Sequence, residues 1–425
     1  MALFEEMLDT ERRMAYLKYR ESRGETDGRL QGMREYLLRG AYTEDVRRLA
    51  RGEYTLSVPA RKEIPKGYTD RKRTIYHFTE DEMTLLRMMA FVLHDCEDLI
   101  PREVYSFKRG ISVKDLVWKI SRCPELREQY VVKADVVSYG NSIRAERLID
   151  MLREGFAARD PQALAFFTWL LRRRTWYSDG VLTEGDTAAL PGIPIHNFFT
   201  NLYLTDTDRK LAPRCELYGR YSDDIILFQK TRPEAEENLR LLLSELDAHG
   251  LIPHRDEKTS IFEPGQAYDF LGFSFEGSQV DLARASVQKL KRRMRIRAKR
   301  IGLDRDGRLQ TPEEKARLLI RLNRQTFFGK AGSNDLCWSQ WAFPVITRTE
   351  RLHELDLYNQ QCIRYVMTGK WSDAGYRVRY AALKELGYES LVRSYYGSRS
   401  RAQHDPGTTD QIMQGETCTC TVLPN

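Results

Sequence analysis

Two adjacent aspartates, Asp223 and Asp224, stand directly before the apolar run 225–228. The surrounding stretch, ELYGRYSDDIILF, predicts two short strands joined by a turn that holds both acids. Carboxylates at the edge of a buried strand repel each other and lose hydration, so they persist there only when paired or when they bind a metal ion. The alternative is an exposed turn, and two neighbouring aspartates alone favour that alternative.

A third acid changes this balance. Asp135 lies at the end of QYVVKADVVSY, which its apolar and β-branched residues predict to be a buried strand. Three carboxylates that converge across neighbouring strands are the ligands that a pair of Mg²⁺ ions about 3.5–4 Å apart requires. Such a pair activates a primer 3′-hydroxyl and stabilises the pyrophosphate that leaves a nucleoside triphosphate.

Basic residues are clustered, although the net charge of +7 is modest for 425 residues. They gather in KEIPKGYTDRKR (62–73) and in VQKLKRRMRIRAKR (287–300). Clustered Lys and Arg form the electrostatic footprint of a protein that binds phosphate backbones. The second run carries basic residues on all sides of a predicted helix, which favours phosphate binding over a solvated helix face.

The length allows two or three domains, and the composition is that of a globular protein. No apolar run approaches the roughly 18 residues of a membrane span, and the start, MALFEEMLDTERR, lacks a signal-peptide pattern. We therefore expect a cytoplasmic protein that does not enter a membrane. Seven cysteines without a CxxC pair indicate reduced thiols, and neither a disulfide framework nor a zinc module is expected.

Periodicity predicts an alternation of helices and short strands, with a helical region from about residue 285 onward. Segments with helical spacing are 1–50, 81–100, 144–156, 161–174, 198–211 and 233–250, whereas 54–78 and 267–277 read as extended. From about Gly397 the chain loses its periodic apolar residues, and the sequence predicts disorder there.

Seven motifs, in chain order, resemble the palm and fingers motifs of reverse transcriptases. They are PKGYTDRKRTIY, VYSFKRGIS, VVKADVVSYGNSI, LPGIPIHNFFTNLYL, YSDDIILF, DEKTSIF and FLGF, and they cover roughly residues 60–275. The likeness is greatest to the bacterial lineage around group II intron enzymes and their domesticated relatives. It implies an α+β right-hand polymerase, with an N-terminal region and fingers (1–130), a palm with an antiparallel sheet (131–284), a helical thumb (285–396) and a disordered tail (397–425).

The resemblance assigns the acids and a lysine to catalysis. Asp135 and Asp223 would bind two Mg²⁺ ions, and Asp224 would support the site and bind metal less directly. Lys258, in DEKTSIF, falls where these polymerases carry a lysine that protonates the leaving pyrophosphate. Lys72 and Arg73 match the basic pair of the fingers hairpin that grips the triphosphate.

Nucleic-acid contacts follow from the same resemblance. Phe270, Leu271 and Gly272 match a small strand that supports the primer end. The helix over 287–300 would lie in a minor groove and contact phosphates without reading bases, through Lys289, Lys291, Arg292, Arg293 and Arg295. For the aromatic segment 333–345, core packing is favoured over stacking on bases.

The chain departs from the family pattern in its nucleotide pocket, to which Tyr221 of the Tyr-x-Asp-Asp box also belongs. The family usually places a bulky aromatic five residues after the first metal acid, where it blocks a ribose 2′-hydroxyl; this chain has Gly140, with Tyr139 before it. Either Tyr139 closes the pocket, or discrimination between ribo- and deoxynucleotides is weak. The loop LPGIPIHN, which includes Pro194, has Leu190-Pro191-Gly192 where Pro-Gln-Gly is usual and His196-Asn197 where Ser-Pro is usual. His196 is either a hydrogen-bonded loop residue or a contact to primer, template or nucleotide.

With these departures, the chain resembles the stand-alone reverse transcriptases of bacterial antiphage defence, in the abortive-infection and defence-associated groups. The expected activity is RNA-directed DNA synthesis from dNTPs on a dedicated, structured non-coding RNA. Alternatives are template-independent or protein-primed synthesis, RNA synthesis permitted by Gly140, and a silent RNA-binding scaffold, against which the intact acids argue. The sequence indicates no oligomeric state.

Overall fold

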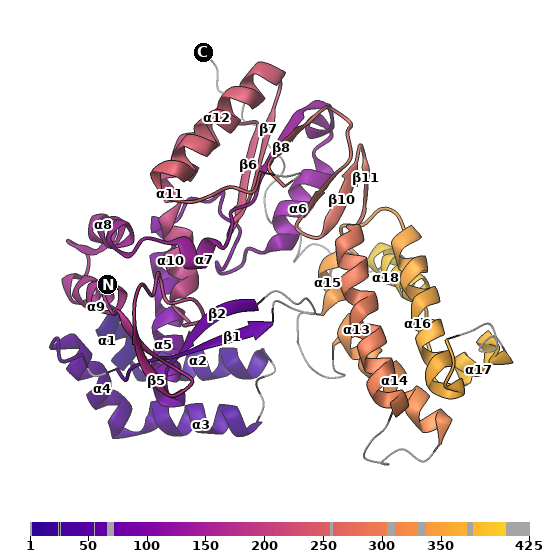
Figure 1. The fold of residues 1–425 in the computed structure, drawn as a ribbon, viewed down its shortest axis with the longest axis horizontal. Coiled ribbons are helices and arrows are strands. Elements are labelled where there is room, and N and C mark those ends of the chain that lie inside the picture. Colours follow the sequence, from indigo (N-terminus) through magenta and orange to yellow (C-terminus); the bar gives the residue numbers. More distant parts are fainter. Residues whose placement is uncertain are drawn as a thin grey trace. The chain divides into compact units, whose positions relative to one another are not determined.

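The chain folds into two compact units of mixed α and β structure with antiparallel sheets, as the sequence predicts (Figure 1). The first unit comprises residues up to Leu116 together with Glu128–Pro264, and the second comprises Val117–Arg127 and the chain from Gly265 onward. The structure is a computed structural model. It describes residues 2–23, 25, 27–54, 56–65, 72–255, 258–303, 311–329, 337–371 and 377–404.

Helices form the N-terminal 50 residues, as their spacing predicts. Asp9 begins the second of them by accepting a hydrogen bond from the backbone N–H of Arg12 at 2.7 Å, which satisfies one of the free donors of a helix start. Their apolar faces pack on the long helix α5 and bury Leu3, Met7 and Leu37. The N-terminal helices are α1 (Leu3–Leu8), α2 (Thr10–Ser22), α3 (Asp27–Leu38) and α4 (Gly40–Ala50), and α5 is Glu80–Leu93.

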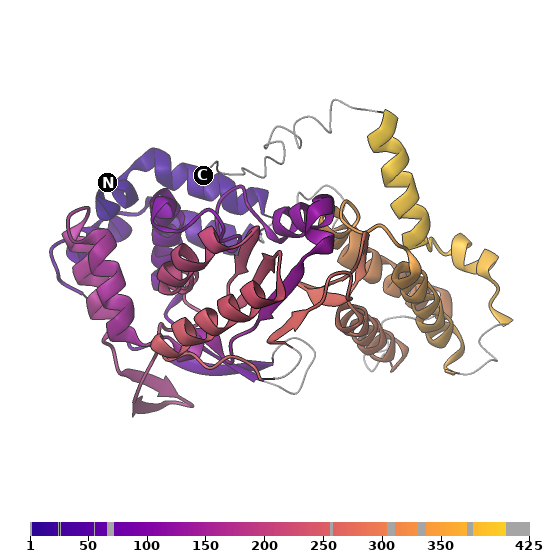
Figure 2. The same cartoon turned by 90° about the horizontal axis from the view of Figure 1, so that it is seen from above.

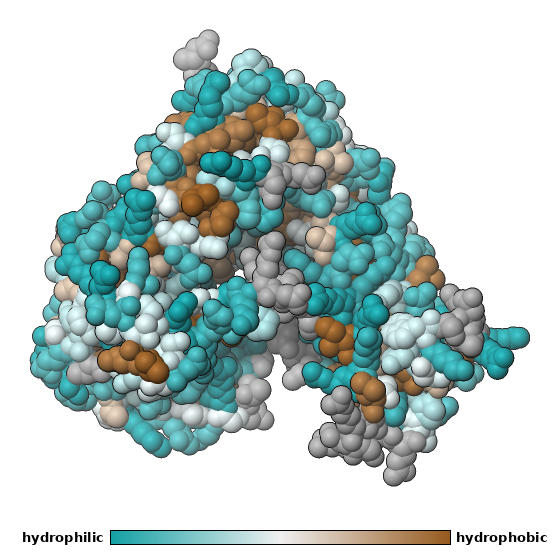
Figure 3. All heavy atoms as spheres, viewed as in Figure 1, coloured by the Kyte–Doolittle hydropathy of each residue, from teal (hydrophilic) through white to brown (hydrophobic). Residues whose placement is uncertain are grey.

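A four-stranded sheet follows, in the order β2-β1-β4-β5. Its strands are β1 (Ala60–Pro65), β2 (Lys72–His77), β4 (Thr175–Ser178) and β5 (Val181–Glu184). The β4–β5 hairpin turns at Asp179 and Gly180, both with positive φ, an Asp-Gly signal that our sequence interpretation did not use. Val181 and Leu182 of β5 are exposed on this hairpin. Apolar patches are visible on the face of the molecule drawn in Figure 3.

A second four-stranded sheet, in the order β6-β7-β3-β8, is antiparallel throughout. It consists of β3 (Tyr130–Ala134), β6 (Leu217–Tyr221), β7 (Asp224–Gln229) and β8 (Ser260–Phe262). Helix α12 (Arg232–Ala248) lies along this sheet and packs on β3 and β7 (Figure 2). The strand-turn-strand prediction for ELYGRYSDDIILF is therefore confirmed.

Short helices complete the first unit around an aromatic core that includes Phe156, Phe166, Phe167 and Phe199. They are α7 (Tyr139–Ser142), α8 (Ala145–Phe156), α9 (Pro161–Leu171), α10 (His196–Tyr203) and α11 (Thr205–Leu211), and α6 (Val113–Arg122) leads into the second unit. Short 3-10 helices lie at His94–Leu99, Pro124–Glu128 and Ala212–Arg214.

The strands β9 (Tyr268–Phe270), β10 (Phe273–Glu276) and β11 (Gln279–Leu282) form a separate sheet in the second unit, in the order β11-β10-β9. The single strand predicted over 267–277 is wrong. Leu271 and Gly272 have φ of 48° and 88°, so the chain reverses there and β9 pairs with β10. The predicted palm, residues 131–284, includes these strands, and among the described strands no ladder joins them to β3 or β7.

Helices make up the rest of the second unit, and α13, α14 and α16 pack against one another (Figures 1 and 2). They are α13 (Arg284–Leu303), α14 (Pro312–Phe328), α15 (Trp338–Ala342), α16 (Glu350–Thr368), α17 (Tyr380–Glu385) and α18 (Leu391–His404). Trp338 contacts the rings of Trp341, Phe343 and Phe327, as core packing predicts.

The disorder predicted from residue 397 is wrong as far as His404, where α18 ends. Buried Asp356 accepts hydrogen bonds from the backbone N–H groups of Leu391 and Val392 and so caps the start of this helix. Tyr395 of the same helix is buried. Residues 405–425 lie outside the described residues.

None of the helices in the described ranges is long and apolar enough to cross a membrane. No disulfide joins the cysteines of the described ranges, and Cys418 and Cys420 lie outside them.

Candidate active site

Three aspartates meet at one end of the β6-β7-β3-β8 sheet. Asp223 lies in the two-residue turn between β6 and β7, and Asp224 is the first residue of β7. Ala134 at the end of β3 pairs with Ile225, so the antiparallel register places the next residue, Asp135, across from Asp224. The structure thus brings together the three acids that the sequence predicts to act together.

Lys258 and His254 stand beside Asp135. Lys258 Nζ donates a hydrogen bond to Asp135 Oδ2 at 2.7 Å, and His254 Nε2 lies 3.8 Å from the same oxygen and 3.4 Å from Lys258 Nζ. The backbone N–H of His254 also donates to the carbonyl of Asp135 at 2.8 Å. Lys258 is therefore close enough to the acids to serve the proton-donor role that the resemblance implies.

The environment of Asp224 disfavours its charged form. Burial, together with the negative charges of Asp223 and Asp135, raises the pKa of Asp224 from its ordinary value of 3.8 to about 7, against the opposing effect of Lys133 and Lys258. The register of β3 and β7 places the three carboxyl groups at one end of the sheet, where their charges repel one another. Clustered carboxylates of this kind favour the binding of a cation.

The donor chemistry of these residues fits Mg²⁺. Carboxylate oxygens are hard ligands, and Mg²⁺ in proteins is commonly bound by one or two carboxylates together with substrate phosphates. Within the described part of the chain, no group of three or more His, Cys, Asp or Glu side chains is assembled as a complete metal site. Asp135 and Asp223 would supply two carboxylates to such an ion.

Tyr139 and Gly140 follow Asp135 on the short helix α7. Tyr139 is buried and its hydroxyl donates to the carbonyl of Thr200 at 2.5 Å, so its ring points into the core. Gly140 is half-buried, and a Cβ built on it would lie 2.8 Å from His196 Nε2. The imidazole of His196, rather than the phenol of Tyr139, covers the position where the family has its bulky aromatic.

His196 begins helix α10 and is fixed in one orientation. Its Nδ1 lies 2.9 Å from the carbonyl of Ala189, which can only accept, so Nδ1 carries the proton and Nε2 is left as an acceptor. Burial lowers the pKa of His196 to about 4, so the ring is neutral at pH 7. Its hydrogen bond to Ala189 agrees with the role of a hydrogen-bonded loop residue. Its position over Gly140 is compatible with a contact to primer, template or nucleotide.

Lys72 and Arg73 lie on a different sheet, exposed at the start of β2. Lys72 Nζ is 3.3 Å from Glu63 Oε2 on β1. The strand is connected to the loop that precedes His196, because Tyr76 N–H donates to the carbonyl of Pro191 at 2.7 Å. Pro194 is half-buried in that loop, whereas residues 66–71 of the predicted fingers motif lie outside the described residues.

The predicted primer-supporting residues and the basic helix belong to the second unit. Phe270 is buried at the end of β9, and Leu271 and Gly272 form the β9–β10 turn. Gly272 approaches α13 closely, because a Cβ there would lie 3.0 Å from Ser286 Oγ. These residues are thus positioned to shape a hairpin at the start of the basic helix.

The basic residues of α13 divide into two groups. Lys291 pairs with Glu354 at 2.6 Å and lies over the ring of Tyr358, so its charge is neutralised within the unit. Lys289 and Arg292 are exposed, Arg293 is half-buried, and Arg295 is exposed over Trp371. The prediction of basic side chains on all sides of the helix therefore overstates the free charge, since it omits the acid that α16 supplies.

Two residues near the acids escaped the sequence analysis. His254 is an isolated histidine in LIPHRDEK, without a spacing that marks it, and only folding places it beside Asp135. Arg220 did carry a signal, since a charged residue stands within the otherwise apolar strand β6.

Tyr221, at the end of that strand, packs against the ring of Phe107 with centroids 5.9 Å apart, and burial raises its pKa.

No protein-family model and no curated protein sequence matches the chain. Among solved structures, the chain is similar to the telomerase of Candida albicans in complex with a fragment of telomeric RNA, at 14% identity and a TM-score of 0.41, over 85% of this chain and 68% of that one. It is also similar to an apo telomerase of Candida tropicalis truncated from its C-terminal domain, at 13% identity and a TM-score of 0.41, over 53% of this chain and 55% of that one. Likenesses this distant do not decide the function.

Proposed function

We propose that the chain is a nucleotidyltransferase that acts as an RNA-directed DNA polymerase. The observation that carries this proposal is the meeting of Asp135, Asp223 and Asp224 at the ends of the adjacent strands β3 and β7, with Lys258 against Asp135. Solvated turn aspartates would show neither the raised pKa of Asp224 nor a convergence of acids from segments 88 residues apart. This arrangement supports phosphoryl transfer over a scaffold role.

The acids and Lys258 would have different roles in the reaction, metal binding and proton donation. Asp135 and Asp223 would hold Mg²⁺, which when bound supplies Lewis-acid stabilisation of the attacking and leaving oxygens. Lys258 would hold a proton on Nζ for the leaving pyrophosphate. Asp224 would support the metal site from the first position of β7, and when ionised it adds to the local negative charge. The exposed Lys289, Arg292 and Arg295 on α13 would contact the phosphates of the nucleic acid.

The specific substrate is part of the proposal and rests on the motifs alone. We propose that the template is a structured non-coding RNA, that dNTPs are polymerised into DNA, and that the product serves antiphage defence. The lineage would be that of the stand-alone, group II intron-like bacterial enzymes.

The first experiment measures nucleotide incorporation by the protein purified with its co-purifying RNA. Labelled dNTPs and NTPs are supplied separately with Mg²⁺, before and after RNase treatment. We expect polymer from dNTPs, its loss after RNase, and its loss in the Asp223→Ala/Asp224→Ala variant. The matched control is Glu236→Ala/Glu237→Ala, which removes the same two charges from the exposed face of α12 and should retain synthesis.

Each outcome has a distinct meaning. Synthesis that survives RNase but not the aspartate substitutions favours the template-independent or protein-primed reaction. Full synthesis in the Asp223→Ala/Asp224→Ala variant would exclude these acids from catalysis. An absence of polymer from both dNTPs and NTPs, with the co-purifying RNA present, would favour the RNA-binding scaffold.

Sugar selection provides a second test. Since His196 covers Gly140, we expect His196→Ala to open the pocket and to raise the ratio of NTP to dNTP incorporation by about tenfold. The ratio is measured as kcat/KM for matched nucleotide pairs. The control is His94→Ala, whose ring pairs with Glu97 elsewhere in the first unit. An unchanged ratio in His196→Ala would show that this ring does not line the sugar site.

A further inference from the structure

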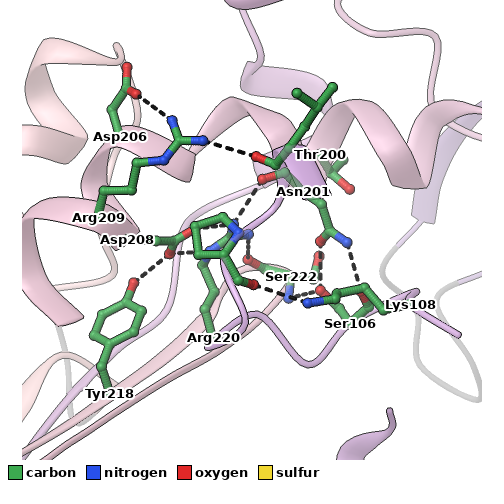
Figure 4. Close-up of polar contacts among 12 residues, drawn as sticks. Ser106, Lys108, Thr200, Asn201, Asp206, Asp208, Arg209, Tyr218, Arg220 and Ser222 are labelled. Atoms are coloured by element: carbon green, nitrogen blue, oxygen red, sulfur yellow. Dashed lines mark hydrogen bonds and ion pairs between the residues drawn. The ribbon is translucent and has the colours of Figure 1, made fainter. Parts of the chain in front are cut away.

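The turn that carries Asp223 is held by Ser106 from outside its hairpin and by Arg220 from strand β6 (Figure 4). Ser222 precedes Asp223 and has φ of 60°, a left-handed conformation that a serine adopts at some cost. Its N–H donates to Ser106 Oγ at 2.9 Å, and its carbonyl accepts from Arg220 Nη1 at 3.2 Å. Both backbone groups of this one residue are therefore tied to the body of the first unit.

Arg220 is fully buried and is bound on several sides. Its Nε donates to Asp208 Oδ1 at 2.7 Å, and its Nη2 donates to Asp208 Oδ2 at 2.5 Å and to the carbonyl of Asn201 at 2.8 Å. This bidentate geometry fixes the plane of the guanidinium, so that Nη1 is directed at Ser222.

The hydrogen bonds around Arg220 and Ser222 connect the turn to three other segments. Asp208 lies on α11 and also accepts a hydrogen bond from the Tyr218 hydroxyl at 2.7 Å. Asn201 lies on α10, accepts from Ser106 Oγ at 2.7 Å and donates to the Ser106 carbonyl at 2.6 Å. The two ties on Ser222 therefore belong to one continuous network (Figure 4).

Stability alone does not account for a network of this composition. A buried ion pair loses so much hydration that apolar residues of similar volume often stabilise a fold equally well or better. An apolar pair on β6 and α11 would fill the core, but it would offer nothing to the carbonyl of Ser222. The Arg220 guanidinium, by contrast, donates a hydrogen bond to that carbonyl.

We propose that Arg220 and Asp208 are positioning residues that fix the Ser222–Asp223 turn, so that the Asp223 carboxylate is held toward Asp135 for metal binding. The inference rests on the proposed function, because it assigns the network to the metal site of that reaction. Ser106 and Asn201 act in the same way on the other side of Ser222.

The test replaces the network by apolar residues, in the variant Arg220→Met/Asp208→Leu/Tyr218→Phe, which leaves no buried charge without a partner. Amide hydrogen exchange of peptides spanning 217–229 reports the turn directly, and the Mg²⁺ concentration for half-maximal thermal stabilisation reports metal binding. We expect exchange at the turn to rise on the order of tenfold. We expect the Mg²⁺ concentration to rise by about 10–100-fold, and incorporation to require correspondingly more Mg²⁺.

Two further variants make the result decisive. Tyr388→Phe removes a hydrogen bond between a buried tyrosine and buried Asp356 in the second unit, and it should leave both readouts unchanged. Ser106→Ala removes the acceptor for the Ser222 N–H without touching the ion pair, and it should reproduce the effect on exchange and on Mg²⁺. If the triple variant does not fold, Ser106→Ala decides.

The two proposals fail in different ways. Unchanged turn exchange and an unchanged Mg²⁺ requirement in both network variants would overturn the positioning role, even if synthesis depends on Asp223. Synthesis that survives Asp223→Ala/Asp224→Ala would instead overturn the proposed function, whatever the exchange rates show.

Discussion

Replacing Asp224 by Asn is expected to stabilise the metal-free protein at pH 8 and to leave its stability almost unchanged near pH 4. The neighbouring acids and burial raise the pKa of Asp224 from 3.8 to about 7, so the folded chain binds this proton more tightly than the unfolded chain does. The stability of the wild type therefore falls as the pH rises from about 4 to 7. The Asp224→Asn variant lacks this titration, and its advantage should grow over the same interval.

The expected gain at pH 8 is about 1–2 kcal/mol, below the full value of the pKa shift because water reaches this half-buried group. In a chain of 425 residues, that gain corresponds to a Tm increase of roughly 1–2 °C. The measurement is thermal unfolding in EDTA between pH 4 and pH 8. Mg²⁺ should then stabilise the wild type more than the variant, and incorporation should fall in the variant.

Asp150→Asn is the matched control for this experiment. Asp150 is exposed on α8 and pairs with Arg153, so its substitution should not produce a stability difference that grows with pH. A loss of stability in Asp224→Asn throughout the pH range would contradict the prediction, because it would mean that the ionised carboxylate makes a net favourable interaction in the absence of metal.

Local patterns predicted the part of the site that depends on neighbouring residues. The turn of YSDDIILF, the strand before Asp135 and helix α12 each follow from periodicity over a few residues, and the structure contains them. The β9–β10 reversal was missed because FLGF reads as a continuous apolar strand, although Gly272 permits the positive φ that a tight turn requires.

Contacts between distant segments could not be predicted in this way. The direction of the Tyr139 ring depends on the carbonyl of Thr200, 61 residues away, and the neutralisation of Lys291 depends on Glu354, 63 residues away. Arg220 is the instructive case. A buried charge in a strand implies a buried partner, but several acids lie within reach along the chain, and only the packing of α11 on β6 selects Asp208.

Lys258→Ala is expected to reduce the rate of nucleotide incorporation by about 10²–10⁴-fold, the usual contribution of a positioned proton donor. The Nζ group contacts Asp135 at 2.7 Å, so it stands within reach of a group bound to the acids. The rate is measured in single turnover with saturating dNTP, which separates the chemical step from binding and product release.

Lys258→Arg separates proton donation from charge. An arginine keeps a positive charge beside Asp135 but holds its proton too tightly to transfer it, because its pKa exceeds 12. If Lys258 is a general acid, Lys258→Arg should be nearly as slow as Lys258→Ala while its Tm stays close to that of the wild type. If the lysine acts only by neutralising Asp135, Lys258→Arg should retain the wild-type rate.

The control is Lys230→Arg, since Lys230 pairs with Glu216 at 2.8 Å on the exposed surface and should tolerate the change. A wild-type rate in Lys258→Ala would remove this residue from the mechanism and leave the three aspartates as the whole of the predicted catalytic set.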